Sequence, residues 1–200
     1  MKRGRPRNFE TDDVLDSALK VFWEHGFQST NLSELTKATG LSKPSLYAAF
    51  GDKKSLYLTV LERYINLLSE RHVGILTNEP NGRQAIEAFL HSLVNMFTNP
   101  NLPGGCFIIT GTADIGGLSV PKEIEVALHS ALNNTETLIE QRLLKAQRDG
   151  QLQEGTNLKD LCKLFTTLIA GLAVQAKCGT SESTLNMVVT ATMDTWPSSS

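Results

Sequence analysis

The sequence predicts an all-α protein of about nine helices, and three observations lead to this fold class. Apolar residues recur every three or four positions along most of the chain, as they do on the buried face of a helix. No segment shows the strict alternation of apolar and polar residues that marks a half-buried strand. Glycine and proline separate the periodic segments, where they can end one helix and begin the next.

The first helix is expected to begin near Thr11 and to end at Gly26. Thr11 is a good N-cap, and Asp12 and Asp13 place negative charge in the first turn, where it interacts favourably with the helix dipole. Gly26 can supply the C-cap. The apolar positions at helical spacing between these ends are Val14, Leu15, Ala18, Leu19, Val21, Phe22 and Trp23.

Residues 31–50 predict a helix-turn-helix. Asn31 and Ser42 can cap two short helices, and Pro44 lies in the first turn of the second, where a missing N–H costs nothing. A four-residue turn at 39–42 joins these helices, and a longer helix flanks the pair on each side. Two short helices in this arrangement are typical of the helix-turn-helix motif.

The remainder of the chain is expected to form longer helices separated by turns. A fourth helix begins at Gly51-Asp52 and carries apolar residues at helical spacing from Leu56 to Leu68. Later helices are expected at about 83–98, 122–149, 158–176 and 185–196, with a compact apolar segment at 106–115.

Composition limits the class of protein further. The chain has 200 residues, of which 40% are hydrophobic and 20% charged, as in a globular protein of one domain or two small ones. The net charge of −2 argues against a protein that coats nucleic acid. No stretch approaches the roughly 18 apolar residues of a membrane span, so we expect a cytoplasmic protein without a membrane partner. Cys106, Cys162 and Cys178 form no CxxC pair, so neither a disulfide framework nor a structural metal site nor any cofactor is expected.

The charge is unevenly distributed along the chain. Residues 1–71 carry 11 Lys and Arg against 9 Asp and Glu, whereas the remainder carries 8 against 12. Four of the first seven residues are basic, and Arg3, Arg5 and Arg7 are among them. Such a segment is either a solvated tail or a flexible arm that reaches phosphates or a minor groove.

The second helix of the helix-turn-helix is expected to lie in a DNA major groove, with its N-terminal residues nearest the base edges. Leu46 and Phe50 would face inward toward Leu35 and Leu41. Lysine and serine can bond base edges or phosphates, and proline and alanine can touch a thymine methyl group. The starts of the flanking helices can bind phosphates. The predicted DNA contacts are Asn31, Ser33, Ser42, Lys43, Pro44, Ser45, Tyr47, Ala48, Lys53 and Lys54.

These residues lie in a segment that resembles the DNA-binding domain of TetR-family transcriptional regulators. The similarity covers residues 9 to about 56 and rests on the stretches Ala18–Phe27, Leu32–Leu35, Gly40–Tyr47 and Phe50 with Asp52–Leu56. Pro44 and Gly51 depart from the commonest pattern, so the operator sequence is not transferable from relatives. The resemblance implies a three-helix head, a fourth helix that leads to a larger C-terminal domain, a homodimer, and repression relieved by a small ligand. It therefore divides the chain into a basic flexible arm (1–8), a DNA-binding domain (9–55) and a helical ligand-binding and dimerisation domain (56–200).

The resemblance also implies that the last two long helices pack against their counterparts in a second copy as a four-helix bundle. The stretch 158–176 carries apolar residues on more than one face, and Ala170-Gly171 is small enough for close approach. A central helix buried in its own protomer is the alternative. The predicted interface residues are Leu168, Leu172, Val188 and Met193.

The effector pocket implied by the family lies within about residues 56–149 and one face of 158–177. Cys106 follows Pro103-Gly104-Gly105 at a predicted helix N-terminus, where the dipole would lower the pKa of the thiol. The segments Gly105–Phe107 and Leu172–Lys177 resemble a TetR-family branch that includes electrophile- and oxidant-responsive repressors. Cys106 is thus either a sensor of reactive compounds or a small core residue. The predicted pocket or sensor residues are Cys106, Phe107, His72, Phe97, His129 and Gln175.

The expected function is that of a homodimeric repressor that binds palindromic double-stranded operator DNA and is released by a small-molecule effector. There are two alternatives, an activator of the same fold and a repressor that senses electrophiles through Cys106. No catalytic triad, glycine-rich phosphate loop or suitably spaced acid pair indicates an enzyme. A non-specific architectural DNA protein conflicts with the net charge.

Overall fold

The computed structural model describes residues 11–198, and in this part of the chain all regular secondary structure is helical, without strands. The helices α4, η1 and α5 follow one another without a break, and so do α7 and η2, so that the described residues contain nine helical units, as the sequence predicts. The elements are α1 (Thr11–Ser29), α2 (Leu32–Thr39), α3 (Lys43–Phe50), α4 (Lys53–Leu68), η1 (Ser69–Val73), α5 (Gly74–Asn78), α6 (Gly82–Phe97), α7 (Phe107–Gly111), η2 (Thr112–Asp114), α8 (Lys122–Arg148), α9 (Leu158–Lys177) and α10 (Glu182–Met193).

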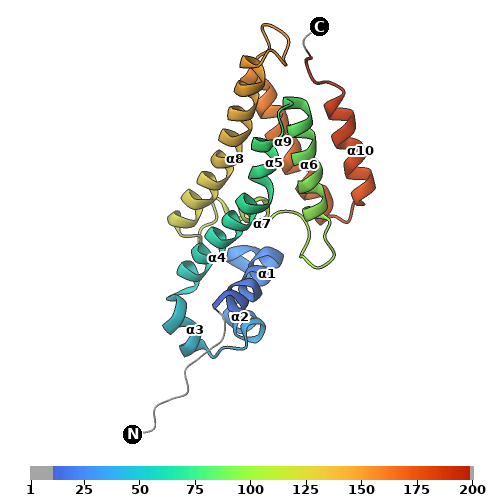
Figure 1. Ribbon diagram of the computed structural model, residues 1–200. Helices are drawn as coiled ribbons and strands as arrows, with labels where there is room; N and C mark the ends of the chain where they lie inside the picture. Colours follow the sequence, from blue (N-terminus) through green and yellow to red (C-terminus); the bar gives the residue numbers. More distant parts are fainter. Residues whose placement is uncertain (1–10, 199–200) are drawn as a thin grey trace.

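The helices gather at two ends of an elongated molecule (Figure 1). We call residues 11–55 the head, which contains α1, α2 and α3, and residues 56–198 the body. Helix α4 begins in the head and continues into the body, where α6, α8, α9 and α10 form a bundle (Figure 1). None of the helices in residues 11–198 is long and apolar enough to cross a membrane.

Local capping positions the two short helices of the head. Asn31 and Glu34 form a capping box, in which the Asn31 side chain accepts from the Glu34 backbone N–H and the Glu34 carboxylate accepts from the Asn31 N–H. Ser42 caps α3 by accepting from the Ser45 N–H, and Gly40 ends α2 in the left-handed conformation. Both predicted caps of the helix-turn-helix are therefore present.

Helix α1 differs from its prediction at its C-terminal end. Gly26 does break the helix, with φ 76° and ψ 179°, but a further turn from Phe27 to Ser29 continues beyond it. The glycine is required there because its φ is positive and because a Cβ atom would lie 2.9 Å from an oxygen of Asp114. The end of α1 is thus shaped by a residue of the body.

A continuous hydrophobic core joins the head to the body. Tyr57 of α4 packs edge-on against Phe22 and Phe27 of the head, and its ring also contacts Phe107 of α7. Leu46 is almost fully buried and anchors α3 to this core, as expected for its inward face. Movements of α4 or α7 therefore cannot leave the packing of the head unchanged.

The transition from α4 to α5 passes through a π-helical turn, η1. Such turns are rare in proteins and often occur at functional sites. Here η1 carries His72, which is buried although histidines on helix surfaces are commonly exposed.

Candidate functional site

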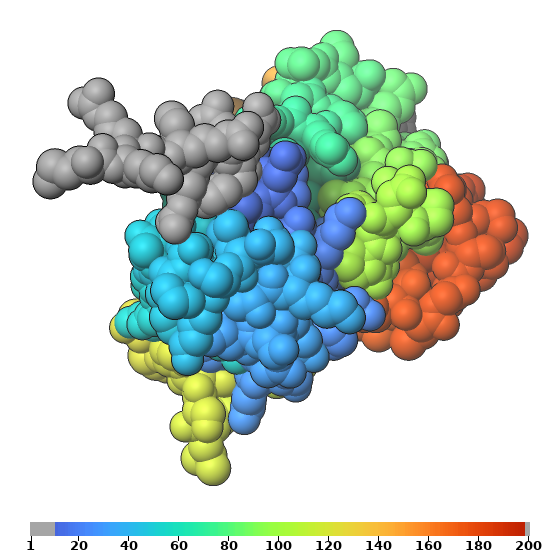
Figure 2. Space-filling view, turned by 90° about the horizontal axis from the view of Figure 1, so that it is seen from below, coloured from blue at the N-terminus to red at the C-terminus, as the bar shows by residue number. Residues whose placement is uncertain are grey.

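The surface predicted to bind DNA is exposed at the end of the head. Ser42, Lys43, Pro44, Tyr47 and Ala48 are exposed, and Ser45 is half-buried. In Figure 2, which views the molecule from this end, α2 and α3 of the head occupy the near face. The buried side of α3 is fixed by packing, while the opposite side presents the predicted contacts to the solvent.

Several of these side chains interact with one another at the start of α3. The Ser42 and Ser45 hydroxyl oxygens lie 2.9 Å apart, and the Lys43 ammonium lies 5.7 Å from the centre of the Tyr47 ring. A lysine at this distance interacts favourably with the face of an aromatic ring. The N-terminal half of α3 and its cap therefore carry a cation and three hydroxyl groups, a set suited to base edges and phosphates.

The two lysines predicted to bind phosphate at the start of α4 have partners within the protein. The Lys53 ammonium lies 4.5 Å from the centre of the Phe27 ring, and burial lowers its pKa. The Lys54 ammonium lies 2.7 Å from a carboxylate oxygen of Glu123 at the start of α8. Lys54 thus links head to body here. Asn31 and Ser33 are exposed, whereas Arg3, Arg5 and Arg7 lie outside the described residues.

A second link between head and body is made by Asp114, which the sequence reasoning missed. Its carboxylate accepts from the Phe27 N–H at 2.6 Å and from the Gln28 N–H at 3.2 Å. The Asp114 side chain is buried, and because aspartate is almost never fully buried without a partner, these two hydrogen bonds account for its position. In the sequence, the only indication of this role was that Asp114 is a single acidic residue at the end of the apolar segment 106–115. Asp114 is the last residue of η2, which continues directly from α7, so the end of α1 is attached to this helical segment.

The same helix is also attached to α1 on its N-terminal side. The Trp23 indole N–H of α1 donates to the Gly104 carbonyl at 3.0 Å, two residues before Cys106. Contacts before and after α7 therefore both involve α1. A displacement of α7 would be transmitted to the head at two points.

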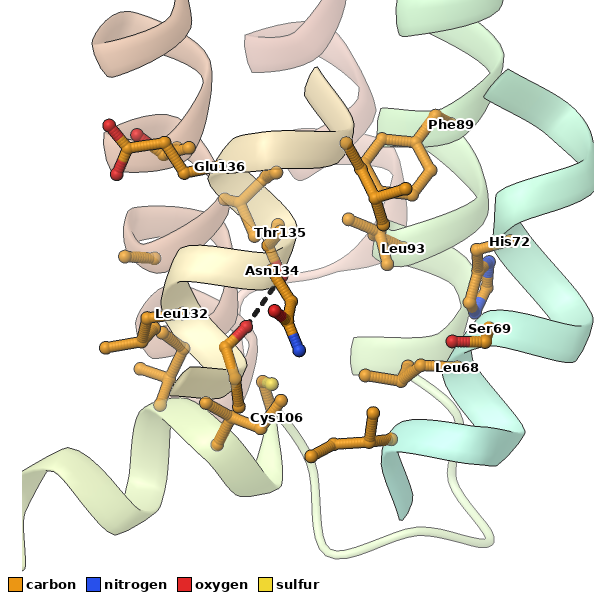
Figure 3. A pocket seen from close by; sticks show the side chains of 18 of the residues that line it. Leu68, Ser69, His72, Phe89, Leu93, Cys106, Leu132, Asn134, Thr135 and Glu136 are labelled. Atoms are coloured by element: carbon orange, nitrogen blue, oxygen red, sulfur yellow. Dashed lines mark hydrogen bonds between the residues drawn. The ribbon is translucent and has the colours of Figure 1, made fainter. Parts of the chain in front are cut away.

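The body contains a cavity of about 170 Å³ between α4, η1, α6, α7, α8 and α9. Its wall is mainly aliphatic and aromatic. Three of the six predicted pocket residues contribute to it, namely His72, Phe97 and Cys106. Figure 3 shows His72 on the wall opposite Asn134 and Thr135, with Cys106 at one end.

The other three predicted pocket residues do not line the cavity. Phe107 points away from it and packs between the rings of Tyr57 and Tyr64. His129 is exposed on α8. Gln175 is exposed near the end of α9 and its side chain accepts from the Thr180 hydroxyl. These three assignments were wrong because helical residues close in sequence face in different directions.

Cys106 lies at the predicted place but its thiol differs from the prediction. It is the N-cap of α7, and its sulfur receives a hydrogen bond from the Tyr64 hydroxyl at 3.4 Å. Burial raises the pKa of the Cys106 thiol, whereas the helix dipole was expected to lower it. The expected direction was wrong because α7 has only five residues and the sulfur is enclosed by the core.

The predicted dimer interface is only partly exposed. Leu172 and Met193 are 2% and 1% exposed, so both belong to the core of their own protomer and were wrongly assigned. Leu168 is half-buried, and Val188 is 41% exposed. Leu164 and Val174 of α9 and Met187 of α10 are further exposed apolar side chains, and at Gly171 no atom lies within 4 Å of the Cβ position. We call the exposed residues Leu164, Gly171, Val174, Met187 and Val188 the outer apolar face.

Within residues 11–198, no three His, Cys, Asp or Glu side chains lie together in a way that could hold a metal ion.

Two family models match the chain. Residues 14–60 match the model described as bacterial regulatory proteins, tetR family, and residues 82–192 match the tetracyclin repressor-like C-terminal domain. The HTH-type transcriptional repressor ComR of Escherichia coli K12 is 32% identical over 196 residues, which cover 98% of this chain and 92% of ComR. The HTH-type transcriptional repressor NemR of the same strain is 25% identical over 171 residues, 85% of each chain.

A solved structure extends this similarity to a DNA complex. It is that of a cysteine mutant of the TetR family transcriptional regulator CifR, complexed with a 26-bp double-strand operator DNA. The match has a TM-score of 0.86 and 31% identity and covers 96% of this chain and all of the CifR chain. The reduced form of Escherichia coli NemR shares the fold, with a TM-score of 0.81 at 21% identity.

Proposed function

The chain belongs to the TetR family of bacterial transcriptional regulators, and from this premise we propose that it is a homodimeric repressor of the cytoplasm. The dimer binds a palindromic operator and leaves it when a small molecule occupies the cavity of the body. The role is regulatory and involves no catalytic step.

The exposed first turn of α3 is the observation that carries this proposal. Lys43, Pro44 and Tyr47 face the solvent while Leu46 fixes the helix to the core. In a helix-turn-helix protein this turn approaches the base edges, and the flanking helix starts bind phosphates. The similarity to CifR, whose structure contains operator DNA, covers 96% of this chain.

The outer apolar face supports the homodimer. Large apolar side chains are exposed on both α9 and α10, and Gly171 leaves room for close approach of another helix. A second copy would cover this face with its own α9 and α10 and form a four-helix bundle. Two heads could then reach successive major grooves, which are about 34 Å apart on one face of DNA.

Helix α7 provides the connection between the cavity and the head. Cys106, Ile108 and Ile109 contribute to the cavity wall, and Asp114 follows a few residues later. A ligand that fits the cavity better after a shift of α7 would also move the Asp114 carboxylate, to which the end of α1 is bonded. Such a ligand shifts the dimer toward a state with misaligned heads because it binds that state more tightly. The expected coupling weakens operator binding about 5- to 150-fold.

Selection of bound fragments from the genome of the source organism tests the DNA-binding role. The full-length protein should enrich a palindrome, which is then used in fluorescence anisotropy titrations. A dimer that makes about 6–10 phosphate contacts should lose roughly 10³–10⁵ in affinity between 50 and 200 mM salt and keep its preference for the palindrome. Equal affinity for all sequences would rule out the proposal. A transcription assay with the same promoter distinguishes repression from activation.

Covalent sensing through Cys106 is a second candidate for the release step. The observation that favours it is the position of the Cys106 side chain in the cavity wall, where an electrophile entering the cavity would meet the thiol. The raised pKa of the Cys106 thiol opposes a fast reaction, because the thiolate is the form that attacks an electrophile. Mass spectrometry of the native protein treated with an alkylating agent tests this mode. An unmodified Cys106, or a Cys106→Ser protein that is released from DNA normally, excludes it.

A further inference from the structure

The cavity itself indicates the kind of molecule that it binds, on the premise that it is the effector site of the proposed repressor. Its volume of about 170 Å³ is close to that of an engineered cavity of about 150 Å³ that binds benzene. Pockets for drug-sized ligands are usually larger, at about 300–1,000 Å³. A molecule with one ring, or of comparable size, therefore fits best. The rings of Phe89 and Phe97 and several aliphatic side chains offer it an apolar wall.

One polar atom of a residue in this wall has no hydrogen-bond partner among the described residues. His72 lines the cavity and is 6% exposed, and its Nε2 is buried without a hydrogen bond. A buried nitrogen that has lost its bond to water destabilises the protein unless another group bonds to it. A ligand in the cavity can supply the missing partner.

The hydrogen bonds around His72 determine which partner Nε2 needs. Its other nitrogen, Nδ1, lies 2.9 Å from the Ser92 hydroxyl oxygen. Ser92 donates its single hydroxyl hydrogen to the carbonyl oxygen of Phe89 at 2.7 Å, so this hydroxyl can only accept from His72. The hydrogen of the neutral imidazole therefore resides on Nδ1. Nε2 is left as an acceptor and requires a donor.

The charges near the cavity disfavour an anionic ligand. None of the described residues in its wall is a lysine or arginine, and its acidic residue Glu136 already binds Lys163 at 2.8 Å. Burial, with a smaller contribution from Arg71, lowers the pKa of His72, so the imidazole is neutral near pH 7. A carboxylate would thus enter an apolar space without a cation to pair with it, which is costly.

From these observations we propose that the cavity binds a small, uncharged, mainly apolar compound of about one ring, which donates a hydroxyl or N–H hydrogen to Nε2 of His72. Ser92 is a positioning residue, because it fixes the hydrogen of His72 on Nδ1. Simple phenols are the nearest available representatives of this class.

Isothermal titration calorimetry of the full-length protein with three matched probes tests the proposal. 4-Ethylphenol carries the required donor, 4-ethylanisole lacks it, and 4-ethylbenzoate replaces it with a negative charge. The phenol should bind about tenfold more tightly than the ether, and the benzoate should bind more weakly than both. Equal affinity for phenol and ether, tightest binding of the benzoate, or binding of none of the three overturns the proposal.

Variants locate the effect at Nε2. His72→Leu should abolish the preference for the phenol over the ether, while His72→Gln should restore part of it because the amide oxygen can accept. Ser92→Ala releases the hydrogen from Nδ1, so the preference should shrink as Nε2 becomes able to donate to the ether oxygen. His129→Gln on the exposed side of α8 is the matched control and should bind like the wild type. A preference that persists in His72→Leu overturns the role of this residue.

Operator binding is measured separately, without any probe. A protein that selects no palindrome but prefers the phenol contradicts the proposed repressor and not the ligand class. A protein that binds its palindrome but shows no preference among the three probes contradicts only the ligand class.

Discussion

The head and the body hold their functional residues in different ways. In the head, the exposed residues of α3 lie within seven positions of one another, and their directions follow from the cap at Ser42 and the buried Leu46. In the body, six separate elements enclose the cavity, and its polar residues come from η1, α8 and α9. A surface for reading DNA can thus be built by local rules, whereas a space for a ligand depends on tertiary packing.

Polar contacts join the two regions in addition to the shared hydrophobic core, and Arg63 of α4, for example, binds Asp16 of α1 at 2.7 Å. Three further contacts involve residues near α7 or at the start of α8. Asp114 holds the end of α1, Gly104 accepts from Trp23, and Glu123 binds Lys54 at the start of α4. Substitutions that affect only the head, only the body or only these contacts should therefore have different consequences.

The largest effect is expected from charge placed on the outer apolar face. Met187, which is 64% exposed, should meet the second copy of the chain, so Met187→Glu introduces two unpaired carboxylates into a symmetric interface. We expect a monomer whose operator affinity is lower by about 100-fold or more. Analytical ultracentrifugation and anisotropy measure the two properties. Leu118→Glu, at a fully exposed loop position, is the control and should leave both unchanged.

A smaller effect is expected from the DNA-binding surface alone. Lys43→Ala removes the exposed cation of α3, and we expect operator binding to weaken by about 1–3 kcal/mol. The dimer, its thermal unfolding and the affinity of the cavity for probes should not change. Lys159→Ala, an exposed lysine of the body, provides the comparison. A similar loss of operator affinity in both variants would mean that net charge, and not the position on α3, decides binding.

The contact at Asp114 tests whether the two regions communicate. Asp114→Asn keeps the size of the side chain but replaces one acceptor oxygen with an N–H₂ group, which cannot accept from Phe27 or Gln28. We expect unfolding to become easier by about 1–3 kcal/mol and the effect of a cavity ligand on operator affinity to decrease. Titrations of operator DNA with and without 4-ethylphenol provide the measurement. Asp149→Asn at the far end of α8 is the control. Full ligand response in the Asp114 variant contradicts the proposed connection through α7.

The smallest effect concerns the ion pair of Lys54 and Glu123. The pKa of Glu123 is lowered mainly by its hydrogen bond to Lys54, so the pair stabilises the folded protein only while this carboxylate is ionised. The stabilisation is fully present above the ordinary glutamate pKa and is lost as the pH falls through the lower pKa of the folded state. Glu123→Gln should therefore reduce Tm slightly at pH 7, and the difference from wild type should vanish in acid. Because both groups are largely solvated, added salt should also diminish it. A difference that increases in acid would contradict this pairing.

The comparison of head and body also explains what could be predicted from sequence. The caps at Asn31 and Ser42, the turn at Gly40 and the inward Leu46 depend on neighbours within a few residues, and each was identified correctly. The break at Gly26 was predicted, but its partner Asp114 lies 87 and 86 residues from the N–H groups that it accepts. No local pattern contains that information.

Errors in the body have the same origin. Leu172 and Val174 are both apolar and both lie on α9, yet the first is in the core and the second is exposed. Apolar periodicity indicates that a helix has two apolar sides but does not say which side faces its own protomer. The thiol of Cys106 shows the same limit, since its burial outweighs the local dipole. His72 could be named as a pocket residue from the sequence. The role of its Nε2 as an acceptor could not, because it follows from the contact of His72 in η1 with Ser92 in α6 and from the bond of Ser92 to Phe89.

The central claim is that two heads, joined through the bodies, read the two halves of one palindrome. Binding of the full-length protein to its selected operator, and to the same duplex with one half-site scrambled, tests this most directly. We predict one dimer per intact operator and a loss of at least tenfold in affinity when either half-site is scrambled, since each mismatched base pair alone costs about 1–3 kcal/mol. Equal affinity for the intact and the half-scrambled duplex, or a single protomer bound per operator, would contradict the account.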